Sequence, residues 1–174
     1  MSDPQRLPLL GCGLVVGVTG HRDLRDEELP GLRAQVRAFF LALRRDYPGL
    51  PLTLLSPLAA GADQLVTQVA RELDVRVVAV LPVPAAMYRA DFEDAGSQAL
   101  YDRQLAQCQV LELPLRHAGD RDAVERGGRA RDLQYAQAGI FASSHCHILL
   151  ALWDGEESGL LGGTAQVVSF HLQG

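Results

Sequence analysis

Four short segments of this 174-residue chain combine glycine or proline with side chains that could bind an anion or move a proton. The first is Thr19-Gly20-His21-Arg22. Gly20 lets the backbone approach a ligand closely, and the Arg22 guanidinium can grip a phosphate or carboxylate with two parallel hydrogen bonds. His21 could donate to a phosphate or ribose oxygen. The alternative is a tight turn with a surface arginine and a packed histidine, and we favour ligand binding for the segment as a whole.

The second segment, Ser56 to Asp63, precedes a predicted helix. Free N–H groups and the positive dipole end make a helix start attractive to an anion. Gly61 and Ala62 add little side-chain bulk at that point. Asp63 either caps the helix or serves the site, as a hydrogen-bond partner of a ribose or as part of the wall.

The third segment, Pro82-Val83-Pro84, is a stiff loop that lacks two backbone N–H donors. It suits the wall of a pocket, beginning with Pro82, or equally well the simple end of a strand. Tyr88, Arg89, Asp91 and Phe92 follow closely and could close over a nucleotide base.

The fourth segment runs from Trp153-Asp154-Gly155 to Gly162-Gly163-Thr164. A glycine pair and a threonine at a helix start offer bare amides, a hydroxyl and the helix dipole, which together suit a phosphate. The spacing is not that of the P-loop, and no GxGxxG pattern follows a predicted strand. The alternative is a glycine-rich hinge in which Thr164 caps the helix.

Other chemistry has less support. His145, Cys146 and His147 are neighbours, but adjacent residues at a strand start rarely converge on one ion, so we predict no metal site. The sequence contains no GxSxG pattern, the motif that would indicate a serine hydrolase. All 16 basic residues are arginine, which excludes Schiff-base chemistry and a P-loop lysine.

Alternating apolar strands and amphipathic helices must position these segments. The fold class we predict is α/β, a Rossmann-like three-layer sandwich with a mainly parallel sheet of about five or more strands. In such sheets ligands bind beyond the carboxyl ends of the strands, near a switch in strand order. The predicted strands are 14–19, 52–55, 75–81, 109–113 and 148–153. The predicted helices are 29–47, 64–73, 84–108 with a break at 96–97, 130–144 and 164–172, with a loop at 116–128.

Length and composition indicate one globular domain, residues 1–174, with 48% hydrophobic and 21% charged residues. The last helix ends the chain abruptly, which would fit a domain of a longer protein. The formal net charge of −5 argues against general polyanion binding and makes nucleic acid a poor candidate partner. No apolar run reaches about 18 residues, so we expect no membrane insertion. The widely spaced Cys12, Cys108 and Cys146 are typical of reduced thiols in a cytoplasmic protein.

Five segments taken in order resemble the SLOG superfamily, which groups the Smf/DprA-type DNA-processing proteins with the LOG-type phosphoribohydrolases. They are VGVTGHRDL, LLSPLAAGADQLV, VRVVAVLPVP, HCHILLALWDG and GGTAQVV, within residues 13–170. The chain is also similar to bacterial proteins described as Rossmann-like nucleotide-binding. The resemblance implies a nucleotide site at the strand ends and, as in many relatives, a homodimer.

In LOG-type enzymes, a glutamate in a GG-x-GT-x-x-E motif and an arginine on the preceding helix release a base from a nucleoside monophosphate. The resemblance places the motif's glycine pair on Gly162-Gly163, its acidic position near Gln166 and the helix arginine near Ala138. A glutamine cannot act as a general base, and Ala138 carries no charge. Catalytic residues therefore stay unassigned, and whether the chain is an enzyme stays open. Arg129 and Arg131 could still reach a phosphate.

The first functional hypothesis is binding of a nucleotide or nucleotide-derived ligand by a sensor or signalling domain, with Mg²⁺ an optional companion and no resident cofactor. The alternative is a nucleotide-processing hydrolase acting on an N-glycosidic or phosphoester bond. Asp63, Asp91 or Asp154 would then replace the missing carboxylate. A further alternative is DprA-like binding of single-stranded DNA, or else a protein-interaction domain. The DNA alternative depends on an arginine cluster interleaved with acids, namely Arg121, Arg126, Arg129 and Arg131.

Overall fold

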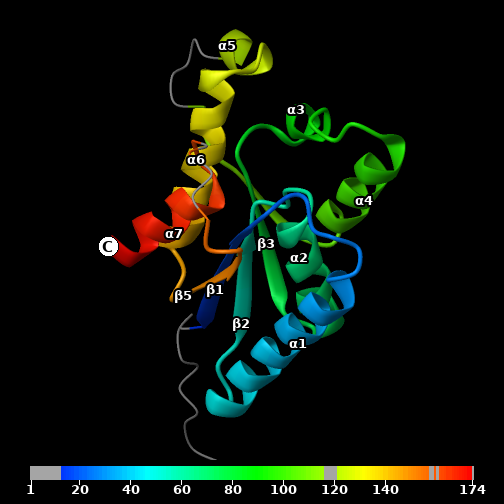
Figure 1. The fold of residues 1–174 in the computed structure, drawn as a ribbon, viewed down its shortest axis with the longest axis vertical. Coiled ribbons are helices and arrows are strands. Elements are labelled where there is room, and N and C mark those ends of the chain that lie inside the picture. The colour runs from blue at the N-terminus through cyan, green and yellow to red at the C-terminus, as the bar shows by residue number, and fades with distance from the viewer. Residues whose placement is uncertain (1–12, 116–120, 157–158, 160, 174) are drawn as a thin grey trace, which may run out of the picture.

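Five parallel strands form one sheet in the order β4-β3-β2-β1-β5 (Figure 1). The computed structural model describes residues 13–115, 121–156, 159 and 161–173. The strands are β1 Leu14–Gly20, β2 Leu52–Ser56, β3 Arg76–Leu81, β4 Gln109–Glu112 and β5 Ile148–Leu152. This confirms the predicted Rossmann-like α/β class with a parallel sheet.

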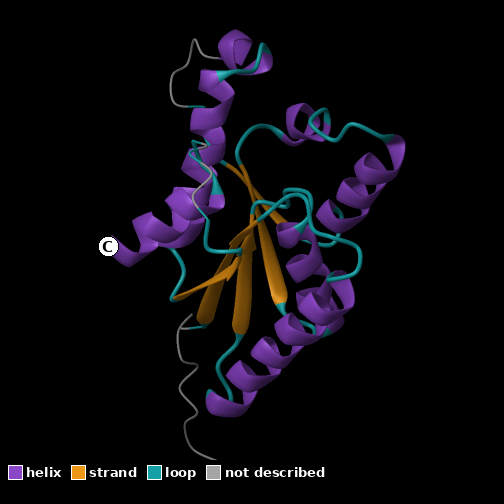
Figure 2. Cartoon of the chain, viewed as in Figure 1, coloured by secondary structure: helices purple, strands orange, loops and turns teal. Residues whose placement is uncertain are grey.

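Helices cover both faces of the sheet and make three layers (Figure 2). From β1 to β4 the chain steps in one direction across the sheet, and it then returns past β1 to β5. Right-handed crossovers put the helices of these two paths on opposite faces. Helices α1 and α2 pack on one face, with α4 beside α2, while α6 and α7 pack on the other. The bounds are α1 Leu29–Asp46, α2 Ala62–Glu72, α3 Ala85–Arg89, α4 Ala95–Leu105, α5 Arg121–Glu125, α6 Arg129–Ser144 and α7 Thr164–Gln173.

Strand β1 shows why its sequence is apolar on both faces. Val16 and Val18 are buried in the core beneath α1 and α2. On the other face Gly17 lies under α6, where a Cβ would be 3.0 Å from the Cys146 sulfur and 3.1 Å from the Ala142 carbonyl oxygen. A strand covered on both sides has no solvated face to mark with polar residues, so it forms a continuous apolar run.

Two local expectations differ from the structure. The segment predicted as one helix over 84–108 is two helices, and the break lies at residues 90–94 instead of 96–97. Asp94 caps α4, because its carboxylate accepts the backbone N–H groups of Gly96 and Ser97 at 2.8 and 3.0 Å. The predicted loop at 116–128 contains the short helix α5, and residues 116–120 lie outside the described part.

Among the helices that the structure describes, none combines the length and apolar character needed to cross a membrane. Cys108 and Cys146 are free thiols, and burial raises the pKa of both. Cys12 lies outside the described residues.

Candidate functional site

The strand order reverses between β1 and β5, and a cavity of about 870 Å³ lies beyond the carboxyl ends of these strands. Its volume is within the usual range for small-molecule sites. The structure brings most of the predicted site residues to its wall. They are Thr19, Gly20, His21, Arg22, Asp63, Pro82, Trp153, Asp154, Gly162, Gly163 and Thr164.

Gly61, Ala62 and Gly155 lie outside the cavity lining, and for the first two the reason is visible. The Ala62 N–H donates to the His21 carbonyl at 3.0 Å. Gly61 has φ +77°, and a Cβ there would lie 2.2 Å from the Arg22 carbonyl oxygen. These two residues therefore hold the loop after β1 against the start of α2, and the first amide of that helix is not open to an anion.

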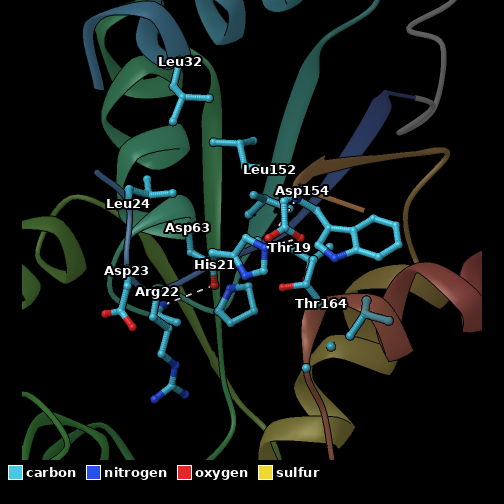
Figure 3. A pocket seen from close by; sticks show the side chains of 18 of the residues that line it. Thr19, His21, Arg22, Asp23, Leu24, Leu32, Asp63, Leu152, Asp154 and Thr164 are labelled. Carbon is cyan, nitrogen blue, oxygen red and sulfur yellow. Dashed lines mark hydrogen bonds and ion pairs between the residues drawn. The ribbon is translucent and has the colours of Figure 1, made fainter. Parts of the chain in front are cut away.

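The loops after β1 and β5 are joined across the switch point (Figure 3). The His21 N–H donates to the Leu152 carbonyl at 3.1 Å, and its Nε2 lies 3.0 Å from an Asp154 carboxylate oxygen. That oxygen also accepts the Glu156 N–H at 2.9 Å. These contacts, led by the Glu156 N–H, lower the pKa of Asp154. The Trp153 indole donates to the Glu156 carbonyl at 2.8 Å, so this loop is braced from within.

Arg22 is a cavity-lining cation that has no ion pair in the described part of the chain. Its guanidinium carbon lies 5.3 Å from the centre of the Tyr135 ring, a cation–π contact. Among the described residues the Arg22 side chain has no ion pair or hydrogen bond, and it is exposed. Figure 3 shows it pointing away from His21 and Asp154. An arginine placed in this way is available to an anionic ligand.

Arg131, by contrast, is already occupied. Its guanidinium pairs with Asp91 at 2.7 Å, donates to the Met87 and Val124 carbonyls at 3.0 Å, and contacts the Tyr135 hydroxyl. Neither Arg131 nor the exposed Arg129 lines the cavity. The expectation that they reach a ligand phosphate is therefore wrong for this geometry. Asp91 is also no longer a candidate reactive carboxylate, because its oxygens accept hydrogen bonds from Arg131 and Tyr135.

Asp63 is a buried carboxyl at the cavity wall, with 5% of its surface exposed. It does not cap α2, because Gly61 occupies the cap position. One of its oxygens accepts the Ala59 N–H at 3.3 Å. Burial raises the pKa of Asp63 to about 7, against the lowering effects of the Ala59 N–H and the Arg22 cation. A carboxyl that titrates near neutral pH in a cleft is a candidate for binding or proton transfer.

The start of α7 forms the opposite side of the cavity. Thr164 is the first residue of the helix, is 8% exposed and lines the cavity together with Gly163. Gln166, where the resemblance places the acidic LOG position, accepts the Gly162 N–H at 2.6 Å and does not line the cavity. Ala138, at the position of the helix arginine, is buried and lines it without a charge. The described cavity thus lacks both charged groups of the LOG-type pair.

The sequence did not indicate Tyr135, which lines the cavity and whose ring contacts the Arg22 guanidinium. It also missed the rim beside the start of α1, which includes Leu24 and Leu32. The one available signal for Tyr135 is its spacing of four residues from Arg131 on a helix, which puts both on one face. Over the described residues, no group of three His, Cys, Asp or Glu side chains could hold a metal ion.

The fold and the cavity at its switch point define a doubly wound α/β protein of the Rossmann-like class. Among solved structures the chain is similar to DNA processing protein A (DprA) from Streptococcus pneumoniae, with 16% sequence identity and a TM-score of 0.57. The match covers 91% of this chain and 48% of that one, so the chain spans about half the length of that protein. The fold is therefore DprA-like. No family model matches the sequence, and no curated protein matches it.

This match overturns one expectation, that nucleic acid is a poor candidate partner. The shared fold is that of a DNA processing protein. The expectation depended on the net charge of −5, which sums over the whole surface and carries no information about a local arginine cluster.

Proposed function

We propose that this chain binds a nucleotide or a nucleotide-derived ligand in the cavity between the loops after β1 and β5. The observation that carries the proposal is the unpaired Arg22, which lines the same cavity as the start of α7. The cavity thus offers an anionic ligand a guanidinium, the Thr164 hydroxyl and the helix dipole. The SLOG resemblance of the sequence segments agrees with this placement.

A thermal-shift screen tests the proposal. The panel is AMP, ATP, GTP, NAD, ADP-ribose and cyclic dinucleotides, each with and without Mg²⁺. A ligand at 100 times its Kd stabilises by about 2.7 kcal/mol, which raises the melting temperature by roughly 5–10 °C for a chain of this size. Chromatography of the same mixtures shows whether the nucleotide is consumed, which would indicate the hydrolase alternative. No shift with any member would contradict nucleotide binding.

The variant Arg22→Ala locates the phosphate. We expect a loss of roughly 10- to 100-fold in affinity for a nucleotide that shifts the wild type, because a hydrogen-bonded ion contact is lost. The melting temperature of the free protein should fall by only about 1–4 °C, because within the described residues the exposed guanidinium has no ion pair or hydrogen bond and the variant loses only the cation–π contact with Tyr135. Arg129→Ala is the matched control, an exposed arginine outside the cavity lining. Unchanged affinity in Arg22→Ala would place the anion elsewhere.

Binding of single-stranded DNA is the second candidate, and the DprA-like fold favours it. Fluorescence anisotropy with a labelled single-stranded oligonucleotide at 50 and 200 mM salt tests it, since contacts to a nucleic-acid backbone weaken steeply with salt. Binding that falls with salt would support the DNA candidate, and absence of binding at 50 mM salt would count against it.

A further inference from the structure

Two buried polar side chains line the cavity, and each has a polar atom without a hydrogen-bond partner in the described part of the chain. Asp63 is 5% exposed and Tyr88 is 2% exposed, and both line the cavity. One oxygen of Asp63 accepts the Ala59 N–H, but within the described residues no group donates to the other oxygen or bonds the Tyr88 hydroxyl. Over the described residues, the fully enclosed side-chain atoms without a hydrogen bond are Gln104 Oε1 and Gln137 Oε1. The unpaired Asp63 oxygen and the Tyr88 hydroxyl are not among them, so these atoms open to the cavity that both residues line and are available to a ligand.

The pair is firmly held and lies close enough to Arg22 for their charges to interact. The Tyr88 ring packs edge-on against Phe92 and Tyr101, with centroid distances of 5.6 Å to each. Asp63 lies in the first turn of α2 and Thr164 begins α7, so the two side chains reach the cavity from different helices. The cavity, at about 870 Å³, has room for both a phosphate and a sugar.

We propose that Asp63 and Tyr88 form a second subsite, which binds the hydroxyl groups of a sugar in the ligand, while Arg22 and the start of α7 hold its phosphate. This inference rests on the proposed function and deepens it. A carboxyl and a phenol side by side can accept and donate hydrogen bonds to adjacent hydroxyls. Sugar phosphates, nucleotides and nucleoside diphosphate sugars are the ligand class with both features.

The charges around the pair add a pH dependence. Arg22 faces Asp63 from the loop after β1, and Tyr88 faces it from α3. Tyr135 and Asp91 act on Tyr88 from α6 and from the residues after α3. Because burial raises the pKa of Asp63 to about 7, the carboxylate forms between pH 6 and 8. Sugar hydroxyls donate more strongly to the carboxylate than to the neutral acid, so binding should tighten over this range.

Isothermal titration with ribose 5-phosphate and with inorganic phosphate separates the two subsites. We expect the wild type to bind ribose 5-phosphate at least tenfold more tightly than phosphate. Asp63→Asn and Tyr88→Phe should each lower the ratio of ribose 5-phosphate affinity to phosphate affinity roughly tenfold. Tyr101→Phe is the matched control, because Tyr101 belongs to the same aromatic cluster, lies outside the cavity lining and bonds the Ala85 carbonyl at 3.5 Å.

Both test variants should fold. An asparagine oxygen at position 63 can still accept the Ala59 N–H, and a phenylalanine keeps the edge-on packing of the ring at position 88. The phosphate of the ligand titrates in the same pH range as Asp63. The quantity to compare is therefore the ratio of wild-type to Asp63→Asn affinity, which should rise by up to about tenfold from pH 6 to pH 8.

The outcomes distinguish this inference from the proposed function. If ribose 5-phosphate binds no more tightly than phosphate, or if both variants keep the wild-type preference, the sugar subsite is overturned. Nucleotide binding in the thermal-shift screen would then leave the proposed function standing. If no nucleotide shifts the protein either, both proposals fail together.

Discussion

At the scale of single residues, neighbouring side chains in the cavity divide into those that hold the structure and those left available. Asp91 and Arg131 form an ion pair at 2.7 Å, so neither side chain is available to a ligand. Arg22 and Asp63, which both line the cavity and whose charges interact, form no such ion pair within the described residues. Natural sequences seldom leave a buried carboxyl in this state without a use. The stability cost of Asp63 can therefore be measured separately from its role in binding.

The variant Asp63→Asn should be more stable than the wild type, increasingly so as the pH rises from 5 to 7. Asp63 has a pKa of about 7 in the folded protein and 3.8 as its ordinary value, so between these values the folded chain holds a proton that the unfolded chain has lost. The wild-type free energy of unfolding then falls as pH rises, by up to about 1.4 kcal/mol per pH unit, and levels off above pH 7. Urea denaturation at pH 5, 6, 7 and 8 measures this difference.

Asp46→Asn is the control for this experiment, since Asp46 is an exposed carboxylate whose pKa is lowered by its hydrogen bond from Arg45. It should show no gain in stability as pH rises. A constant difference between Asp63→Asn and the wild type at all four pH values would contradict the burial of an uncompensated carboxyl at this position.

How far single residues could be predicted depends on whether backbone or side-chain packing decides their position. Gly20, Arg22 and Thr164 sit directly at strand ends or a helix start, so the order of elements alone brings them to the cavity. Tyr135 lies inside α6, six residues after that helix begins. Its place at the cavity depends on how α6 packs across the sheet, which short-range sequence patterns do not encode.

At the scale of elements, the site depends on how closely the loop after β1 packs onto the start of α2. The Gly61 backbone takes a positive φ of 77°, and its missing side chain lets the His21 and Arg22 carbonyls approach. This contact fixes the direction in which Arg22 leaves the strand end. The sequence indicated an anion site at Gly61, but the residue instead allows the loop after β1 to pack against α2.

Gly61→Ala should lower stability by more than the cost of positive φ alone. The strain of an alanine in this region is about 1–2 kcal/mol, and a Cβ placed 2.2 Å from the Arg22 carbonyl oxygen must also displace the loop. Gly49→Ala is the matched control, with φ +89° and nothing within 4 Å of the added carbon. Thermal unfolding should show the larger loss for Gly61→Ala, together with weakened nucleotide binding. Equal losses in the two variants would show that the contact is not tight.

The strands and long helices were predictable because burial on both faces gives strands an apolar run and burial on one face gives helices a periodic pattern. The break before α4 lies earlier than the predicted position at 96–97 for a local reason. Asp94 and Ser97 satisfy each other's backbone N–H groups at the helix start, and this capping box outweighs the continuous helical pattern around it. Short helices such as α5 have too few residues to show a period at all.

At the scale of the whole molecule, the strand order unites the site and was not readable from the sequence. Strands β2, β3 and β4 run outward from β1 in succession, and only the return of β5 to its other side creates the switch point. The sequence indicates alternating strands and helices but not which edge the last strand joins. As a result, the cavity wall includes residues from the first fifth of the chain and from its last helix.

This arrangement predicts a distinctive pattern of hydrogen exchange upon binding. A nucleotide in the cavity should slow exchange together in three separate stretches, namely residues 19–23, 59–63 and 161–165, because all three contribute residues to the cavity wall. Helix α4 and strand β4 lie away from the cavity lining and serve as internal controls. Local opening of the loops, and not global unfolding, governs exchange at such sites, so the protection should saturate with ligand occupancy. Protection confined to one of the three stretches would mean that the ligand binds one loop without bridging the switch point. No single ligand would then span the proposed phosphate and sugar subsites.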